Sequence, residues 1–125
     1  MYKNFICNLY TDKMTNITIT RKQKKIVSIV CDGHTDYGEE GEDIVCAALS
    51  SIVQTAVLGI MQVAQIAAEY KIDPKIPLAS LTLPQNLTQQ ERNNADMILE
   101  TMYLGIADLQ AEYGRWVKLT ERKQQ

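Results

Sequence analysis

The chain has 125 residues, a formal net charge of −2 and a hydrophobic content of 46%. This length fits a single domain, and this share of apolar residues is enough to bury a core. The slight excess of acidic residues argues against partners held by bulk attraction, so we expect no direct contact with nucleic acid.

The N-terminal part of the chain predicts a leader followed by a β-hairpin. Met1 to Lys13 has too short an apolar stretch for a signal peptide, so we expect a mobile leader or extra N-terminal segment before one domain over residues 14–125. Residues 15–21 alternate isoleucine with threonine, which is typical of a half-buried strand, and the β-branched run at residues 26–31 predicts a second strand. The basic residues between the two runs are interpreted as a solvated hairpin tip.

A long apolar helix is expected after a glycine-rich and acidic segment. Gly38 and Gly41 should interrupt regular structure, and the helix should begin at Glu42 or Asp43, since acidic residues suit a first helical turn. Its apolar periodicity continues to Tyr70. The apolar residues cover more than one face, which predicts two packing partners, the sheet and a second copy of the chain. Glutamines and serines interrupt the run, so we predict a buried helix and no membrane span.

The C-terminal half predicts two more strands and one more helix. Two prolines mark residues 71–77 as a connector, and residues 78–84 alternate like a strand. Thr88 and Glu91 form the pattern of a capping box before a helix that Gly114 should end, and residues 115–121 predict a last short strand. The order β-β-α-β-α-β predicts an α+β two-layer domain, with a mixed or antiparallel sheet of about four strands and two long helices.

His34, the one histidine, and Cys46 are the candidates for chemistry. A thiol in the first turn of the long helix would have a lowered pKa, because free N–H groups and the helix dipole stabilise the thiolate. His34 follows the strand before that helix, so its imidazole could act as a base for the thiol, and the helix N-terminus offers donors to an oxyanion. The residue types alone leave a second interpretation open, a packed core cysteine and a surface histidine.

The chain has three cysteines at widely separated positions and no Cys-x-x-Cys pair. This spacing disfavours a disulfide framework and a zinc site, and it indicates a reduced protein of the cytoplasm. Cys31 is interpreted as a packed strand residue, with a redox partnership to Cys46 as the alternative.

The segment DGHTDYGEEGEDIVCAALS, residues 32–50, closely resembles the signature of the ribosomal-processing cysteine proteases, the Prp family. That signature holds a Gly-His pair, a glycine-bearing loop, the run Gly-x-Asp-Ile-Val-Cys-Ala-Ala and then a serine. It places His34 and Cys46 at the two candidate catalytic positions, with a defined number of residues between them. The likeness extends more weakly over the domain from Met14, and Thr35 stands where the family usually has alanine.

The resemblance implies a small cytoplasmic, dimeric protease that acts in ribosome assembly. Its substrate would be ribosomal protein twenty-seven of the large subunit, from which it would remove a short N-terminal extension after an aromatic residue. His34 would be the base and Cys46 the nucleophile. The loop that contains Gly33, Gly38 and Gly41 would be a mobile cover over the substrate peptide. Neither a cofactor nor a metal ion is expected.

Three alternatives stay open at the level of sequence. Asp43 could orient His34, or it could cap the helix or lie in its first turn. The chain could be a non-catalytic module that binds a ribosomal protein. It could also be a thiol-dependent transferase, which would use Cys46 without hydrolysing a peptide bond.

Overall fold

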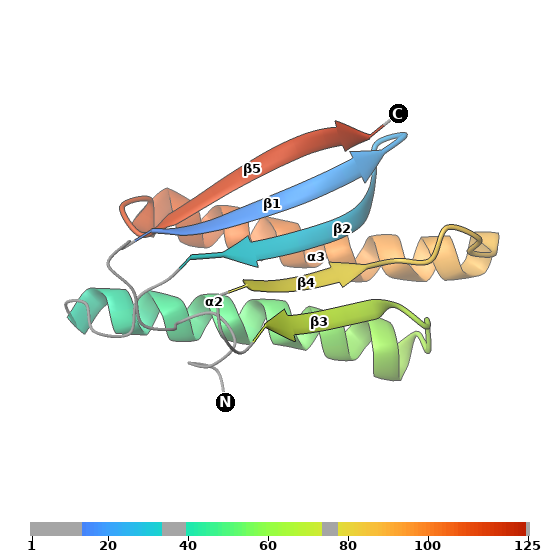
Figure 1. Cartoon of the computed structure of the whole chain (residues 1–125), viewed down its shortest axis with the longest axis horizontal. Coiled ribbons are helices and arrows are strands. Elements are labelled where there is room, and N and C mark those ends of the chain that lie inside the picture. The colour runs from blue at the N-terminus through green and yellow to red at the C-terminus, as the bar shows by residue number, and fades with distance from the viewer. Residues whose placement is uncertain (1–13, 34–39, 74–77, 125) are drawn as a thin grey trace.

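The computed structural model describes residues 14–33, 40–73 and 78–124, with side chains described from residue 44 onward in the second range. Within these residues the chain forms a sheet layer covered on one side by a layer of two long helices (Figure 1). The elements in chain order are β1 (Thr15–Lys22), β2 (Lys25–Asp32), α2 (Glu40–Leu58), the π-helical turn η1 (Gly59–Val63), β3 (Glu69–Asp73), β4 (Leu78–Thr82), α3 (Gln89–Tyr113) and β5 (Val117–Gln124). The predicted α+β two-layer class is confirmed.

The sheet is mixed and has five strands in the order β3-β4-β2-β1-β5. β1 pairs antiparallel with β2 through a two-residue turn, and β5 pairs parallel with β1 over the full length of both strands. The turn residues Gln23 and Lys24 have φ values of 53° and 69°, the left-handed conformation that a two-residue hairpin turn demands. The turn and the end of β5 therefore lie at one end of the sheet, and the end of β2 lies at the other.

The predicted long helix is wrong at both of its ends. It begins at Glu40 and so includes Gly41 in its first turn, and its α-helical part stops at Leu58. One π-helical turn continues to Val63, and Gln65 then adopts a left-handed φ of 55°. Residues 69–73 form β3, an exposed edge strand, where the sequence predicted first helix and then connector. Tyr70 and Ile72 alternate with charged residues, which is a strand pattern, and the apolar run that precedes them led the sequence-based prediction to extend the helix over them. Hydrogen bonding with β4 fixes the strand.

The second helix follows its sequence signals closely. The backbone N–H of Glu91 donates to the Thr88 hydroxyl at 3.1 Å, and the Thr88 N–H donates to the Glu91 carboxylate at 2.9 Å. This reciprocal pair is the predicted capping box, and Gly114 is the predicted end of the helix, in a right-handed conformation. The predicted strand at residues 78–84 is β4, and the last strand extends to Gln124.

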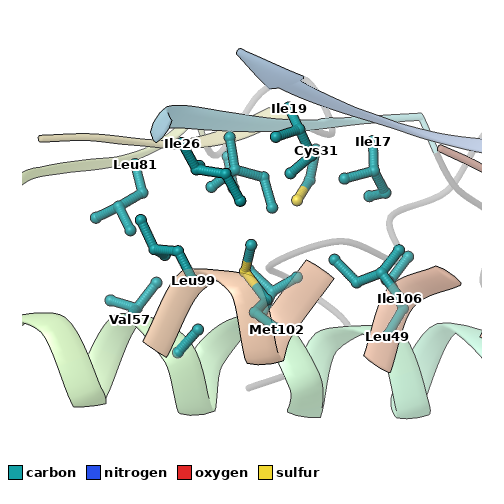
Figure 2. Packing of buried hydrophobic residues seen from close by; sticks show 14 of the residues in the cluster. Ile17, Ile19, Ile26, Cys31, Leu49, Val57, Leu81, Leu99, Met102 and Ile106 are labelled. Atoms are coloured by element: carbon teal, nitrogen blue, oxygen red, sulfur yellow. The ribbon is translucent and has the colours of Figure 1, made fainter. Parts of the chain in front are cut away.

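The hydrophobic core lies between the sheet and the helices. Figure 2 shows Ile17 and Cys31 of the sheet pointing toward Leu49, Met102 and Ile106 of the helices. These side chains are almost fully buried, so each contributes roughly 1.5–3 kcal/mol from burial of its apolar surface. The layers are thereby fixed relative to one another.

The segment Ile44–Val63 is long and apolar enough, by length and composition, to cross a membrane. In this fold the same segment forms α2 and η1, which pack beside α3 and beneath the sheet (Figure 1). Val45, Leu49, Val53 and Ile60 are buried in the core that this packing creates. The segment is the core helix of the domain, as the sequence predicted.

Candidate active site

Gly33 fixes the direction in which the chain leaves β2. Its φ is +85°, which side-chain-bearing residues rarely adopt, and a Cβ atom at this position would lie 2.8 Å from the carbonyl oxygen of Met14. Both facts require glycine, because only a residue without a side chain takes this φ at low cost and passes so close to another backbone. The first residue of the Gly-His pair therefore has a structural reason to be glycine.

Cys46 lies on the side of α2 that faces the core, and its side chain is 4% exposed. Because α2 begins at Glu40, Cys46 is in the second helical turn, and the prediction that it lies in the first turn is wrong. The dipole effect on charge is concentrated in the first turn, so its contribution to a thiolate here is smaller than expected. Ser50, one turn further on the same face, is also fully buried.

The elements that carry the two motif positions meet at one end of the domain. The arrow of β2 points toward the end of the molecule at which α2 begins, to the left in Figure 1. His34 and Gly38 lie outside the described residues, and so does the side chain of Asp43, whose backbone is in the first turn of α2. The pairing of His34 with Cys46 and the role of Asp43 therefore stay predictions.

The environment of Cys31 does not favour a reactive thiolate. Cys31 lies on β2, faces the core and is 2% exposed, and burial raises the pKa of its thiol to about 12. A thiol with this pKa is neutral at physiological pH and has little thiolate with which to react. Its interpretation as a packed strand residue is confirmed. Neither Cys31 nor Cys46 forms a disulfide.

The described residues lack the kinds of side-chain cluster that bind metal ions in proteins. Across residues 14–33, 44–73 and 78–124, no three histidine, cysteine, aspartate or glutamate side chains come close enough to hold a metal ion.

One polar cluster has no counterpart among the sequence-based predictions. Arg21 on β1 forms ion pairs of 2.6 Å with Glu100 of α3 and Glu121 of β5, and its guanidinium lies 5.0 Å from the ring centre of Tyr103. The Tyr103 hydroxyl also donates to Glu121 at 2.7 Å. These residues are up to 100 positions apart, so no local pattern predicts the cluster. It ties β1, β5 and α3 together away from the end where β2 stops.

The outer side of the helix layer has an apolar groove of about 540 Å³ between α2 and α3. Gly59 allows the two helices to approach closely, because a Cβ atom there would lie 3.2 Å from Ile98. Large apolar side chains stand exposed on the same layer, among them Met97 at 74% and Leu104 at 66%. The lining residues are Ile52, Thr55, Ala56, Gly59, Met97, Ile98, Thr101, Met102 and Gly105.

Comparison with known protein families gives a match over most of the chain. The family model described as cysteine protease Prp matches residues 14–118, a range that contains both His34 and Cys46. A Bacillus subtilis (strain 168) protein named ribosomal processing cysteine protease Prp is 26% identical over 108 residues, which are 86% of this chain and 96% of that protein. A Staphylococcus aureus (strain Mu50) protein of the same name is 26% identical over 107 residues, 85% of this chain and 97% of its own.

Solved structures share the fold. The crystal structure of SMU.848 from Streptococcus mutans superimposes with a TM-score of 0.80 at 25% identity, covering 90% of this chain and 97% of that one. The S. aureus ribosomal processing protease Prp with a covalently linked product peptide gives a TM-score of 0.75 at 25% identity, covering 87% and 100%. The same S. aureus protease with a substrate peptide gives 0.76 at 24% identity over the same shares, a likeness of fold.

Proposed function

The chain belongs to the Prp family of cysteine proteases, and we propose that it removes the N-terminal extension of ribosomal protein twenty-seven of the large subunit. The protein is a cysteine protease, as its curated relatives are. Those relatives are named for ribosomal processing, and a similar S. aureus structure holds a covalently linked product peptide. These two facts support a ribosomal protein as the substrate and a covalent intermediate as the route. The two described cysteines, Cys31 and Cys46, are free thiols, which supports the cytoplasm as its location.

Cys46 is the nucleophile and His34 the base in this proposal. The observation that carries the assignment is the contrast between the two described cysteines. Both thiols are almost fully buried, but Cys31 lies in a strand, where burial raises the pKa of its thiol to about 12, whereas Cys46 lies near the N-terminus of α2, where the helix dipole favours a thiolate. His34 is the residue after Gly33, and the chain has no other histidine.

The reaction would run through a thioester. The Cys46 thiol gives its proton to His34 and attacks the scissile carbonyl carbon, and the oxyanion accepts hydrogen bonds from N–H groups at the start of α2. His34 returns the proton to the leaving amine, which frees the C-terminal product. It then takes a proton from water, which attacks the thioester carbonyl; the carbon–sulfur bond breaks, the N-terminal peptide leaves as a carboxylic acid, and His34 returns the proton to the Cys46 sulfur. No cofactor takes part in these steps.

The nucleophile is tested by replacing the two described cysteines in turn. The wild-type chain, Cys46→Ala and Cys31→Ala are each incubated with the extended ribosomal protein, and the products are weighed by mass spectrometry. We expect wild-type and Cys31→Ala to release two fragments and Cys46→Ala to lose roughly a thousandfold or more in kcat/KM, as happens when a covalent nucleophile is removed.

Each alternative function has its own signature in this experiment. A non-catalytic module would bind the precursor and leave its mass unchanged in all three samples. A thiol-dependent transferase would add mass to the acceptor without producing the second fragment. Activity that survives in Cys46→Ala and disappears in Cys31→Ala would overturn the assignment of the nucleophile.

We also propose that the protease works as a homodimer joined through the groove between α2 and α3. The large exposed apolar side chains of the described residues stand mostly on α2, η1 and α3, and the small groove residues let a second helix approach closely. An apolar groove with exposed apolar side chains on the helices that form it is typical of an interface. In light scattering at micromolar concentration, Met97→Glu with Leu104→Glu should convert a dimer to a monomer. The control is Ile72→Glu: this residue is exposed on the edge strand β3, and its replacement should leave the mass of the dimer unchanged. A dimer that persists in the double variant would contradict this interface.

A further inference from the structure

A polar cleft of about 450 Å³ opens at the end of the sheet farthest from the end of β2. Four separate parts of the chain form it, namely the β1–β2 turn, the segment after β4, the start of α3 and the end of β5, on the right in Figure 1. The lining residues are Lys22, Gln23, Lys25, Val27, Ser28, Thr82, Leu83, Pro84, Gln85, Leu87, Thr88, Gln89, Arg92 and Gln124.

The composition of this cleft favours an anion. Lys22, Lys25 and Arg92 line it, and none of the side chains of its described lining residues carries a carboxylate. Asp96, which lies outside the lining, pairs with Lys25 at 3.1 Å and with Arg92 at 2.7 Å, so one carboxylate faces two cations. Among the described residues, Lys22 has no carboxylate partner within ion-pair distance. The cleft therefore keeps an excess of about two positive charges.

The guanidinium of Arg92 is held in place before any ligand arrives. Besides Asp96, it donates to the carbonyl oxygen of Ile26 at 2.8 Å, and its side chain is only 18% exposed. A positioned donor loses less conformational entropy on binding than a free surface lysine does.

The cationic surface continues over the hairpin tip. A second hollow, of about 600 Å³, shares Gln23 and Gln124 with the cleft and adds Lys24 and Lys123, together with the ion pair of Arg21 and Glu121. Lys24 has the left-handed φ of 69°, at a turn position where glycine or asparagine is usual. A lysine in this conformation costs stability, and such strain is concentrated at functional sites.

We propose that this cleft and the adjoining tip bind a single strand of RNA through its phosphates. Three cations match the phosphodiester backbone, and the seven neutral glutamine, serine and threonine side chains match ribose 2′-hydroxyls and base edges. Pro84 and Leu87 give an apolar wall for a base. An acidic peptide would meet the same cations but has no ribose hydroxyls or bases. This inference is independent of the proposed function, although the two together would place the protease on ribonucleoprotein.

RNA in the cleft would leave the opposite end of the sheet, where β2 stops and α2 starts, open to a peptide substrate. β1 runs from one end of the sheet to the other over 8 residues, which at about 3.3 Å per residue separates the ends by roughly 25 Å. RNA in the cleft and a peptide at Cys46 would therefore bind without competing for the same surface.

Fluorescence anisotropy with a labelled 12-nucleotide single-stranded RNA tests the proposal. At 50 mM salt the wild-type chain should bind with a micromolar Kd, and the plot of log affinity against log salt should have a slope of about −2, as three phosphate contacts predict. Lys22→Gln with Lys25→Gln should weaken binding tenfold or more and bring the slope to about −0.7. The matched control is Lys71→Gln with Lys118→Gln, which removes the same charge outside the cleft and should change the Kd less than twofold.

Competitors and a protease assay complete the experiment. A 12-residue polyglutamate or a DNA strand of the same sequence should bind at least threefold more weakly than the RNA. Equal binding by either competitor would overturn the assignment, as would no RNA binding at 50 mM salt or an equal loss in the control pair. Peptide cleavage should be the same in the cleft variant and the wild-type chain, which also shows that the variant is folded. A chain that binds RNA but cleaves nothing would refute the proposed function alone.

Discussion

The two ends of the sheet are built in different ways. At the end where β2 stops and α2 starts, the candidate catalytic positions lie within twelve residues of one another, and the backbone of Gly33 sets the path of the chain. At the other end, Arg21, Glu100 and Glu121 form one cluster from three distant segments. A short motif can specify the first kind of site, whereas the second kind exists only after the chain has folded.

The two ends also differ in charge. Residues 32–43 contain six acidic residues and no lysine or arginine, whereas residues 21–25 contain four basic residues and no acidic one. β2 separates residues 21–25 from Asp32 by its full length, and the acidic first turn of α2 lies toward the Asp32 end, so charges of opposite sign lie at the two ends of the sheet although the net charge is only −2. The sequence-based expectation of no nucleic-acid contact used the total charge, and the total conceals this separation.

Gly33→Ala, at the end of the sheet where β2 stops and α2 starts, is expected to have the largest effect on stability and activity. The added Cβ would meet the Met14 carbonyl at 2.8 Å at a left-handed φ, so we expect a loss of about 1–3 kcal/mol in the free energy of unfolding. Displacement of His34 should also lower kcat/KM by roughly a hundredfold. Gly105→Ala is the control, since its Cβ would make an ordinary 3.5 Å contact with the Ile52 side chain of α2. If Gly33→Ala keeps the activity and the melting temperature of the wild-type chain, the conclusion that this position requires glycine is wrong.

A smaller effect is expected from Arg21→Met at the opposite end. Arg21 is largely buried but its carboxylate partners are 40% and 44% exposed, so we expect a loss of about 1 kcal/mol at neutral pH in chemical denaturation. Lys71→Met, whose ion pair with Glu69 spans 3.6 Å in solvent, should change stability by at most ~0.3 kcal/mol. Cleavage of a short peptide should be unaffected by either change, because neither residue lies at the catalytic end.

The difference in the free energy of unfolding between the wild-type chain and Arg21→Met should depend on pH. Hydrogen bonds from Arg21, and then from Tyr103, lower the pKa of the Glu121 carboxyl. A carboxyl whose pKa is lowered by folding stabilises the protein above its unfolded pKa of about 4.3, and this contribution is lost as the pH falls through the folded pKa. The stability gap between wild-type and Arg21→Met should therefore shrink in acid. A gap that widens below pH 4 would contradict the role of the cluster.

The smallest effect is expected from Lys24→Gly at the hairpin tip. Glycine takes the left-handed φ of 69° without steric cost, so the free energy of unfolding should rise by about 0.5–1 kcal/mol. Loss of the lysine charge should at the same time weaken RNA binding about twofold, by the salt-dependent term. Lys22→Gly, at the last position of β1, where the backbone is extended, should not raise stability. If Lys24→Gly gains no stability, the turn is not strained.

The sequence by itself determined the parts of this protein that depend on near neighbours. The hairpin strands, β4, the capping box of α3 and the two-layer class all follow from periodicity and end signals, because these signals act within a few residues. The motif that contains His34 and Cys46 is equally local, so the order of amino acids over residues 32–50 is sufficient to indicate the family.

Only the tertiary structure decided the features that depend on distant partners. β3 is paired along its full length with β4, and this pairing separates it from the long apolar helix that precedes it, a boundary that the sequence-based prediction missed. The Arg21 cluster, the groove between α2 and α3, and the cationic cleft each combine side chains from elements far apart in sequence. Pairing between strands and packing between layers set these distances, and the free energy of such contacts has no counterpart in a local pattern.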